Sequence, residues 1–399
     1  MLPLDRIRII DLTNTWAGPI ATEMCAEMGA EVIKVEGIHR WDVTRAQDYP
    51  DNEPGEEPWN RGGAFHVMNN GKLGITLKLD DDRGKELFKK LVKISDALVQ
   101  NFSPRVMGNW GLDYESLVEI NPDLIMVSMS GFGQTGPWRD RVAYAPVMEV
   151  AAGLPYFTRT VQGLPQAAGA IGDWAASVAA VGALLLALIN RQKTGQGEYI
   201  DVAGREGMLC FIGEAVMDYV LNGRVWENDD FYSTARLNGI YRCRGDDEWI
   251  SISINSDEEW EALCRLMDEP SWAKDDKFSD FLDRWKNRRQ LDGLIEQWTS
   301  QFDHFHLMEL LQQAGIPAGA VTNPQEILFN PHLKQRGLYK LIDHQGIEGK
   351  RSFPKLMSAL SSMAAEDRPA KPAPQLGQDN KYILEEWLGV AKEEIASLE

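Results

Sequence analysis

The chain has 399 residues, of which 44% are hydrophobic and 25% charged, a composition typical of a globular protein with a large core. Its 60 acidic and 41 basic residues give a formal net charge of −19 at pH 7. This acidity argues against a nucleic-acid-binding protein, which needs clustered basic side chains, and against docking on anionic lipid.

Three observations favour a cytoplasmic protein that does not enter a membrane. The longest apolar stretch, around residues 180–189, is far shorter than the ~20 residues that cross a bilayer. The chain does not open with a basic segment followed by an apolar one, so no signal peptide is predicted. Cys25, Cys210, Cys243 and Cys264 lie far apart without a C-x-x-C pair, which is typical of reduced thiols.

The histidines are few and scattered, which limits the chemistry. None lies between residues 66 and 304, so we expect no catalytic histidine in the central third of the chain. No H-x-x-x-H spacing occurs, and we therefore predict no zinc site and no other metal. The six histidines are His39, His66, His304, His306, His332 and His344.

Strand and helix signals alternate over the first 130 residues. This alternation predicts an α/β fold with a parallel sheet covered on both faces, and ligands bound at the carboxyl ends of the strands. Strands are expected at 7–12, 31–36, 74–79, 97–100 and 124–130, and helices at 20–28 and 82–94.

Further along, the chain divides into two predicted domains. Residues 173–190 are apolar on all sides, as in a buried helix, and a strand at 198–202 and a helix at 207–221 follow. Residues 224–330 carry an excess of acidic side chains and mixed strand and helix signals. We expect a large domain from 1–223 plus 331–399, and a small α+β domain from 224–330.

One glycine motif imitates a dinucleotide-binding site. Gly131 to Gly136 reads G-x-G-x-x-G after a predicted strand, but residues 137–141 do not continue as an apolar-periodic helix. A pyrophosphate site needs that helix, so we interpret the motif as a loop that approaches some other ligand closely. The G-x-S-x-G and Walker A signatures are likewise incomplete.

Asp173 opens the predicted buried helix, after Ile171 and Gly172. One interpretation is an N-cap, whose carboxylate accepts backbone N–H bonds. The other, compatible with the first, is an ionised carboxylate held rigidly at the positive end of the helix dipole, where it can act as a covalent nucleophile. Basic side chains near strand ends could hold a phosphorylated ligand. They are Lys34, Arg40, Arg45, Lys72, Lys78, Arg105, Arg139 and Arg141.

Eight segments in order resemble the class III coenzyme A transferases, the family of formyl-CoA transferase and carnitine CoA-transferase. The segments are D-L-T-x-x-x-A-G-P at 11–19, G-A-E-V-I-K-V-E at 29–36, N-F-S-P at 101–104, the run from Gly111 to Pro137, I-G-D at 171–173, R-Q-K-T-G-Q-G-E-Y-I-D-V at 191–202, A-G-I-P-A-G-A-V at 314–321 and A-P-Q-L-G at 373–377.

The resemblance implies a Rossmann-like large domain that binds CoA, a smaller domain and an interlocked dimer. The dimer can be a homodimer or a heterodimer with a paralogous subunit. It also implies that Asp173 forms a covalent aspartyl intermediate while CoA passes from an acyl-CoA thioester to a carboxylic acid, with no metal involved. The positions that match CoA contacts of the family are Trp16, Ala17, Arg40, Lys78, Asn101, Phe102, Ser103, Arg105, Arg141 and Tyr144.

The chain departs from the family pattern at several positions. The expected arginine is absent at Asn109, Gly37 replaces a basic residue, and Asp379 stands where a histidine is usual. Because Trp16 and Trp174 flank the expected site, we expect a larger acceptor acid of the benzylsuccinate or carnitine type rather than oxalate.

Two alternatives remain open. An acyl-CoA racemase or epimerase shares this fold but uses a histidine with the aspartate, and residues 139–144 contain none. A non-catalytic subunit of a heteromeric transferase would have no need of Asp173.

Overall fold

The computed structural model describes residues 2–159, 163–225, 237–355, 371–391 and 395. The chain divides into two compact units, one formed by Met1–Val216 with Lys334–Glu399 and the other by Met217–Leu333. Each unit has its own hydrophobic core.

A six-stranded sheet forms the centre of the first unit, and its strand order is β3-β2-β1-β4-β5-β6. All neighbouring strands pair in parallel, so the predicted parallel α/β sheet is confirmed. The strands are β1 (Arg8–Leu12), β2 (Glu31–Glu36), β3 (Leu73–Thr76), β4 (Ala97–Gln100), β5 (Ile125–Ser130) and β6 (Glu198–Ala203). The strand expected at 74–79 is β3 and is shorter, because it ends at Thr76. The next helix is capped by Asp81, whose carboxylate accepts the N–H of Gly84 at 2.8 Å.

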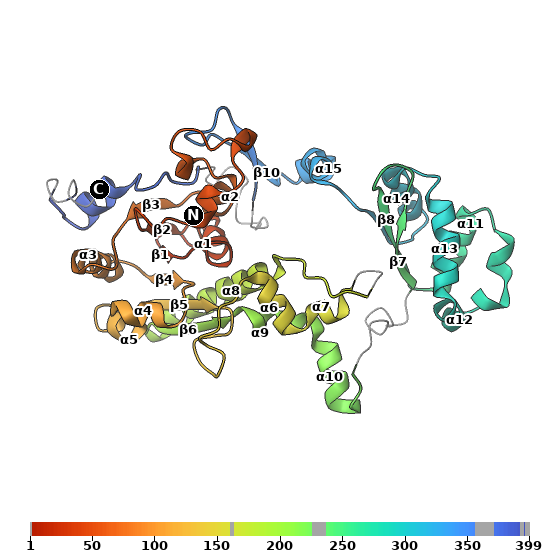
Figure 1. The fold of residues 1–399 in the computed structure, drawn as a ribbon, viewed down its shortest axis with the longest axis horizontal. Coiled ribbons are helices and arrows are strands. Elements are labelled where there is room, and N and C mark those ends of the chain that lie inside the picture. The colour runs from red at the N-terminus through yellow and green to blue at the C-terminus, as the bar shows by residue number, and fades with distance from the viewer. Residues whose placement is uncertain (1, 160–162, 226–236, 356–370, 392–394, 396–399) are drawn as a thin grey trace. The chain divides into compact units, whose positions relative to one another are not determined.

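Helices cover both faces of this sheet (Figure 1). Successive side chains of a strand point to opposite faces, so Ile9 packs with α1 (Ala17–Glu27) and α8 (Ile171–Thr194), whereas Ile10 packs on the other side. That second layer contains α3 (Asp82–Lys93), α4 (Arg105–Trp110), α5 (Tyr114–Val118) and a π-helical turn, η8 (Tyr382–Trp387).

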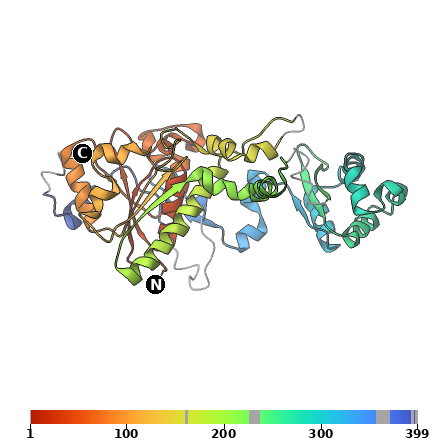
Figure 2. The same ribbon diagram turned by 90° about the horizontal axis from the view of Figure 1, so that it is seen from below.

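The buried helix predicted at 173–190 is α8, which begins two residues earlier and ends before Gly195, a residue with φ of 69°. Its 24 residues are long and apolar enough, by length and composition, to cross a membrane. The sequence estimate of a ten-residue apolar stretch was therefore too short. In this fold α8 packs on the sheet core through small residues such as Ala176 and Ala180 (Figure 2, yellow-green).

The predicted helix at 207–221 is broken into shorter pieces. These are α9 (Gly204–Leu209), a 3-10 turn over Cys210–Ile212 and α10 (Gly213–Asn222). The remaining helices of this part of the chain are α2 (Gly63–Asn69), α6 (Ala145–Ala152) and α7 (Leu154–Phe157).

The second unit has a smaller, antiparallel sheet, as the α+β prediction requires. Its strands β7 (Leu237–Arg242), β8 (Trp249–Ile254) and β9 (Ala318–Ala320) are ordered β7-β8-β9. The helices from this point are α11 (Asp257–Leu266), α12 (Phe281–Lys286), α13 (Arg288–Thr299), α14 (His304–Gln313), α15 (Pro324–Phe329) and α16 (Pro331–Gln335).

The chain then returns to the first unit. β10 (Tyr339–Ile342) and β11 (Arg351–Pro354) form a hairpin. Between them His344 stacks on His66 of α2, with ring centroids 4.0 Å apart. Further on, Asp379 accepts the N–H of Gly74 at 2.7 Å, which ties the C-terminal segment to β3.

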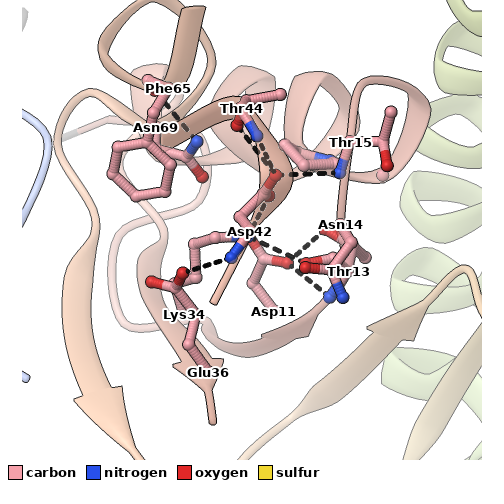
Figure 3. A network of polar contacts seen from close by, with 12 residues as sticks. Asp11, Thr13, Asn14, Thr15, Lys34, Glu36, Asp42, Thr44, Phe65 and Asn69 are labelled. Atoms are coloured by element: carbon pink, nitrogen blue, oxygen red, sulfur yellow. Dashed lines mark hydrogen bonds and ion pairs between the residues drawn. The ribbon is translucent and has the colours of Figure 1, made fainter. Parts of the chain in front are cut away.

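Buried ion pairs lie at the carboxyl edge of the sheet, around β1 and β2 (Figure 3). The ammonium of Lys72 is 2.8 Å from the carboxylate of Asp11, and that of Lys34 is 3.1 Å from Asp42. The four side chains are fully buried. Lys34 also donates to the carbonyl of Thr13 at 2.9 Å, so the network reaches the loop that follows β1.

Charge pairing outweighs burial at Asp11. Burial alone would raise the pKa of Asp11, but Lys34 and Lys72 hold it well below its usual range. Because the pKa is lower in the folded protein than in the unfolded chain, ionised Asp11 stabilises the fold above about pH 4. This contribution is lost as the pH falls below that value.

We expect Asp11→Asn to lower the free energy of unfolding at pH 7 by about 3–5 kcal/mol, because it leaves the ammonium of Lys72 buried without this anion. Urea unfolding followed by far-UV circular dichroism measures the loss. The double variant Asp11→Asn/Lys72→Met should recover part of it. Equal losses in the single and double variants would show that the uncompensated charge is not the cause.

Candidate active site

A cavity of about 260 Å³ opens at the carboxyl ends of the strands in the first unit. Five segments build it: the loop after β1, the turn after β4, the end of β5 with the loop that follows, α6 through Met148, and the first turns of α8. The lining residues of the expected site are Trp16, Ala17, Asn101, Phe102, Ser103, Arg141, Tyr144 and Asp173.

A second cavity, of about 370 Å³, lies next to the first and shares Asn14 and Phe102 with it. It lies against the ends of β1, β2 and β3. Two more expected residues line it, Arg40 and Lys78, and both are exposed. The structure thus distributes the predicted site over two adjoining hollows, where parallel sheets place their ligands.

The loop of residues 13–17 forms a wall of the first cavity and is held by the buried network beneath it. The N–H of Thr15 donates to the carboxylate of Asp42 at 3.1 Å, and Thr15 has a φ of 72°, rare for a β-branched residue. The Asn101 amide accepts from the N–H of Asn14 at 2.8 Å and donates to its carbonyl at 2.7 Å. Asn101 therefore fixes the shape of this wall.

Asp173 is the third residue of α8, not its N-cap. The N-cap position is Ala170, so the N-cap interpretation of Asp173 was wrong. Gly172 permits a close approach here, because a Cβ at this position would lie 3.2 Å from the carbonyl oxygen of Ala145. Ser177, one turn on, donates to the carbonyl of Ala17 at 2.7 Å and thereby ties α8 to the wall of the cavity.

The pKa of Asp173 is shifted against the direction that the helix dipole favours. A carboxylate in the first turn of a helix was expected to stay ionised in the positive end of the dipole. The pKa of Asp173 is raised to about 6, first by burial and then by the negative charge of Glu149, and the group is still mainly ionised at pH 7.

Sequence reasoning missed Glu149 altogether. Its side chain is fully buried, and its carboxylate accepts the N–H of Gly169 and of Ile171, each at 3.0 Å. The only signal was a single acidic residue within the apolar stretch A-P-V-M-E-V-A-A of α6. The sequence could not show that this residue meets a turn twenty positions later.

Several basic candidates are engaged elsewhere. Lys34 and Lys72 belong to the buried network, and Arg45 pairs with Glu36, with 2.6 Å between Nη2 and Oε2. Arg105 lines neither cavity among the described residues. It makes a double hydrogen bond to Asp140, at 2.8 and 2.6 Å.

The glycine motif forms a loop and lacks the helix that a pyrophosphate site needs. No helix opens at this motif; the next one, α6, begins at Ala145. Gly133 has a φ of 84°, and a Cβ at Gly131 would lie 2.5 Å from the Cβ of Ala143. The glycines are therefore needed for the fold of the loop itself. Within that loop, Arg141 stacks on Trp138, 4.6 Å from the ring centroid.

No group of three or more potential metal ligands occurs among the residues that the structure describes. His39 lines the second cavity, and no other histidine lines either hollow within the described ranges.

Comparison with known proteins shows the family to which the chain belongs. The profile of CoA-transferase family III matches residues 4–380. A succinyl-CoA–D-citramalate CoA-transferase of Chloroflexus aurantiacus is 32% identical over 100% of this chain and 97% of its own length. The alpha subunit of a succinyl-CoA–L-malate CoA-transferase of the same organism is 30% identical, over 100% of this chain and 91% of its own.

Among solved structures, a CAIB/BAIF family protein from Brucella suis superposes with a TM-score of 0.83 at 28% identity, covering 96% of this chain and 98% of that one. The sequence resemblance to the class III enzymes is thereby confirmed. This chain belongs to CoA-transferase family III and is a CoA-transferase.

Proposed function

We propose that this CoA-transferase moves coenzyme A from an acyl-CoA thioester to a carboxylic acid through a covalent aspartyl intermediate on Asp173. The observation that carries the proposal is the position of Asp173. It is a half-buried carboxylate in the wall of a cavity at the carboxyl edge of the sheet. Because its pKa is raised to about 6, its ionised form is more basic than an ordinary aspartate and a better nucleophile.

The chemistry proceeds in balanced steps. A carboxylate oxygen of Asp173 attacks the thioester carbonyl, the C–S bond breaks, and the thiolate of CoA leaves with the electron pair. The thiolate then attacks the aspartyl carbonyl of the mixed anhydride, which releases the donor acid and leaves an aspartyl-CoA thioester. The acceptor carboxylate repeats the first step on this thioester. The thiolate finally attacks the acceptor carbonyl, so that Asp173 is regenerated.

We assign the two adjoining cavities to the two ends of CoA. The second cavity has exposed cations, Arg40 and Lys78, which suit the phosphorylated nucleotide end. The shared residues Asn14 and Phe102 would then line the path of the thiol arm toward Asp173. In this assignment residues 1–223 with 331–399 form the CoA-binding domain and 224–330 the small domain.

For the acceptor we favour a diacid with an apolar part, of the benzylsuccinate type, over a carnitine-type acid. Trp16, Tyr144 and Met148 supply apolar and aromatic surface around Asp173. Arg141 lines the same cavity, and its positive charge suits a second carboxylate better than the cation of carnitine. The two relatives above are named for succinyl-CoA with citramalate or malate, which are also diacids.

We further propose a cytoplasmic dimer. Val178, Leu186 and Ile189 of α8 are 59%, 69% and 50% exposed, and α10 has no buried residue, so apolar surface is left for a partner to cover. An interlocked homodimer or a heterodimer with a paralogous subunit would cover it, and the L-malate relative is itself named as an alpha subunit.

The aspartyl route predicts a CoA-sized adduct on the wild-type protein after mixing with a suitable acyl-CoA, and none on Asp173→Asn. Intact-mass spectrometry across a panel of thioesters measures the adduct, and hydroxylamine should remove it. We expect kcat of the variant to fall by at least about a thousandfold, because the covalent route is lost. An adduct that persists on a correctly folded Asp173→Asn protein would refute the assignment. Exchange of an α-proton into deuterated water without an adduct would favour the racemase.

The acceptor proposal predicts that benzylsuccinate competes better than oxalate or carnitine for CoA. Trp16→Ala should raise the KM for benzylsuccinate about tenfold through lost aromatic packing. Trp174→Phe is the matched comparison, because Trp174 does not line the cavity among the described residues. Oxalate as the best acceptor in a mixture would contradict the proposal.

A further inference from the structure

The carboxylate of Glu149, from helix α6, caps the N-terminus of α8. The first N–H groups of a helix lack partners within it, and Ala170 at the N-cap offers no side-chain oxygen. The two oxygens of Glu149 accept the N–H of Gly169 and Ile171 at 3.0 Å, and the N–H of Gly172 lies at 3.5 Å. Glu149 of α6 therefore does for α8 what an N-cap side chain does for an ordinary helix.

This arrangement weakens the stabilisation that the N-terminus of α8 gives to the carboxylate of Asp173. A carboxylate in the first turn is normally stabilised by the free N–H groups and by the macrodipole. Here those N–H groups already face one negative charge, and that charge lies close to the second carboxylate. Burial is the first reason why the pKa of Asp173 is raised to about 6, and Glu149 is the second.

We propose that Glu149 is a positioning residue of the transfer reaction: it holds the first turn of α8 in place, and its charge makes the carboxylate of Asp173 a stronger nucleophile. The inference rests on the proposed role of Asp173.

The benefit arises when Asp173 is acylated. As its oxygen bonds to the thioester carbon and the thiolate leaves, the aspartyl group becomes neutral. Repulsion between Glu149 and Asp173 is present in the free enzyme and absent in the acyl-aspartyl intermediate. The repulsion therefore lowers the free energy of that step and of the intermediate relative to the free enzyme.

Two charged side chains on the surrounding elements are held by other partners. Arg205 of α9 donates to the carbonyl of Ala151 at 2.8 Å, and Asp201 of β6 accepts the N–H of Gln134 at 3.0 Å. The titratable groups on the cavity wall and on the elements packed against α8 are Arg141, Tyr144, Glu149, Arg205, Glu206, Glu23, Cys25, Glu27, Glu198, Tyr199 and Asp201. Of these, Glu149 is the one whose charge raises the pKa of Asp173.

Two variants separate the charge of Glu149 from its hydrogen bonds. Glu149→Gln keeps the length of the side chain and one acceptor oxygen but removes the charge. Glu149→Asp keeps the charge but withdraws it from the N–H groups. The matched control is Asp113→Asn, which removes a carboxylate that caps α5 by accepting the N–H of Ser116 at 2.9 Å and does not line the cavity.

The experiment is a pH profile of single-turnover adduct formation, followed by intact mass. In the wild type the rate should fall in acid with a midpoint near pH 6, because only ionised Asp173 attacks. Glu149→Gln should move that midpoint down by about one pH unit and lower the plateau rate. Glu149→Asp should lower the plateau without moving the midpoint, and Asp113→Asn should change neither.

An unchanged midpoint in Glu149→Gln would overturn the inference, because Glu149 would then only cap the helix. The carboxyl carbon signal of Asp173, identified in ¹³C-aspartate-labelled protein by its loss in Asp173→Asn, gives the pKa without turnover. A lower pKa in Glu149→Gln supports the electrostatic effect and an equal one refutes it. A wild type that forms no adduct would count against the proposed function, while this titration still decides the effect of Glu149.

Discussion

The ion pair between Lys72 and Asp11 is the constraint on which the carboxyl edge of the sheet depends. Taking both charges out of water is unfavourable unless each finds partners, and each does. Asp11 also accepts the hydroxyl of Thr22 at 2.7 Å and the N–H of Thr13 at 3.0 Å. One carboxylate thus joins β1, α1 and the loop after β1. The adjoining pair of Lys34 and Asp42 extends the network, and Asp42 holds Thr15 at its positive φ.

Buried charge of this kind shows why the sequence alone could only name a set of basic candidates. Lys34, Lys72 and Arg45 lie at strand ends or nearby, as phosphate-binding residues do, and only the fold shows that their charges are consumed inside the protein. Arg40 and Lys78 have the same chemistry but stay exposed beside a cavity. Residue type and spacing do not show whether a lysine or arginine will be buried in an ion pair or exposed beside a cavity. The tertiary structure decides this, because it sets which carboxylate lies next to the cation.

The strand and helix pattern was a better guide. Parallel pairing and two helical layers follow from alternating elements and from strands that are apolar on both faces. Element ends were predicted less well. The strand expected at 74–79 ends at Thr76 as β3, and the predicted helix at 207–221 breaks at Cys210–Ile212. Asp173 was selected because it follows Gly172 at the start of the apolar helix, which is a local signal, and because I-G-D matches the family.

Glu149 marks the limit of that local information. A first-turn aspartate considered alone is an ionised group favoured by the helix dipole, and the opposite shift of its pKa comes from a residue in another helix. A buried carboxylate that accepts backbone N–H groups is a sound structural cap by itself. Its place beside a second carboxylate in a cavity wall adds a cost in the free enzyme, which acylation of Asp173 in the proposed mechanism would remove. The proposed mechanism needs a rigid helix start and a negative charge close to Asp173 at the same point, and one side chain, Glu149, can provide both.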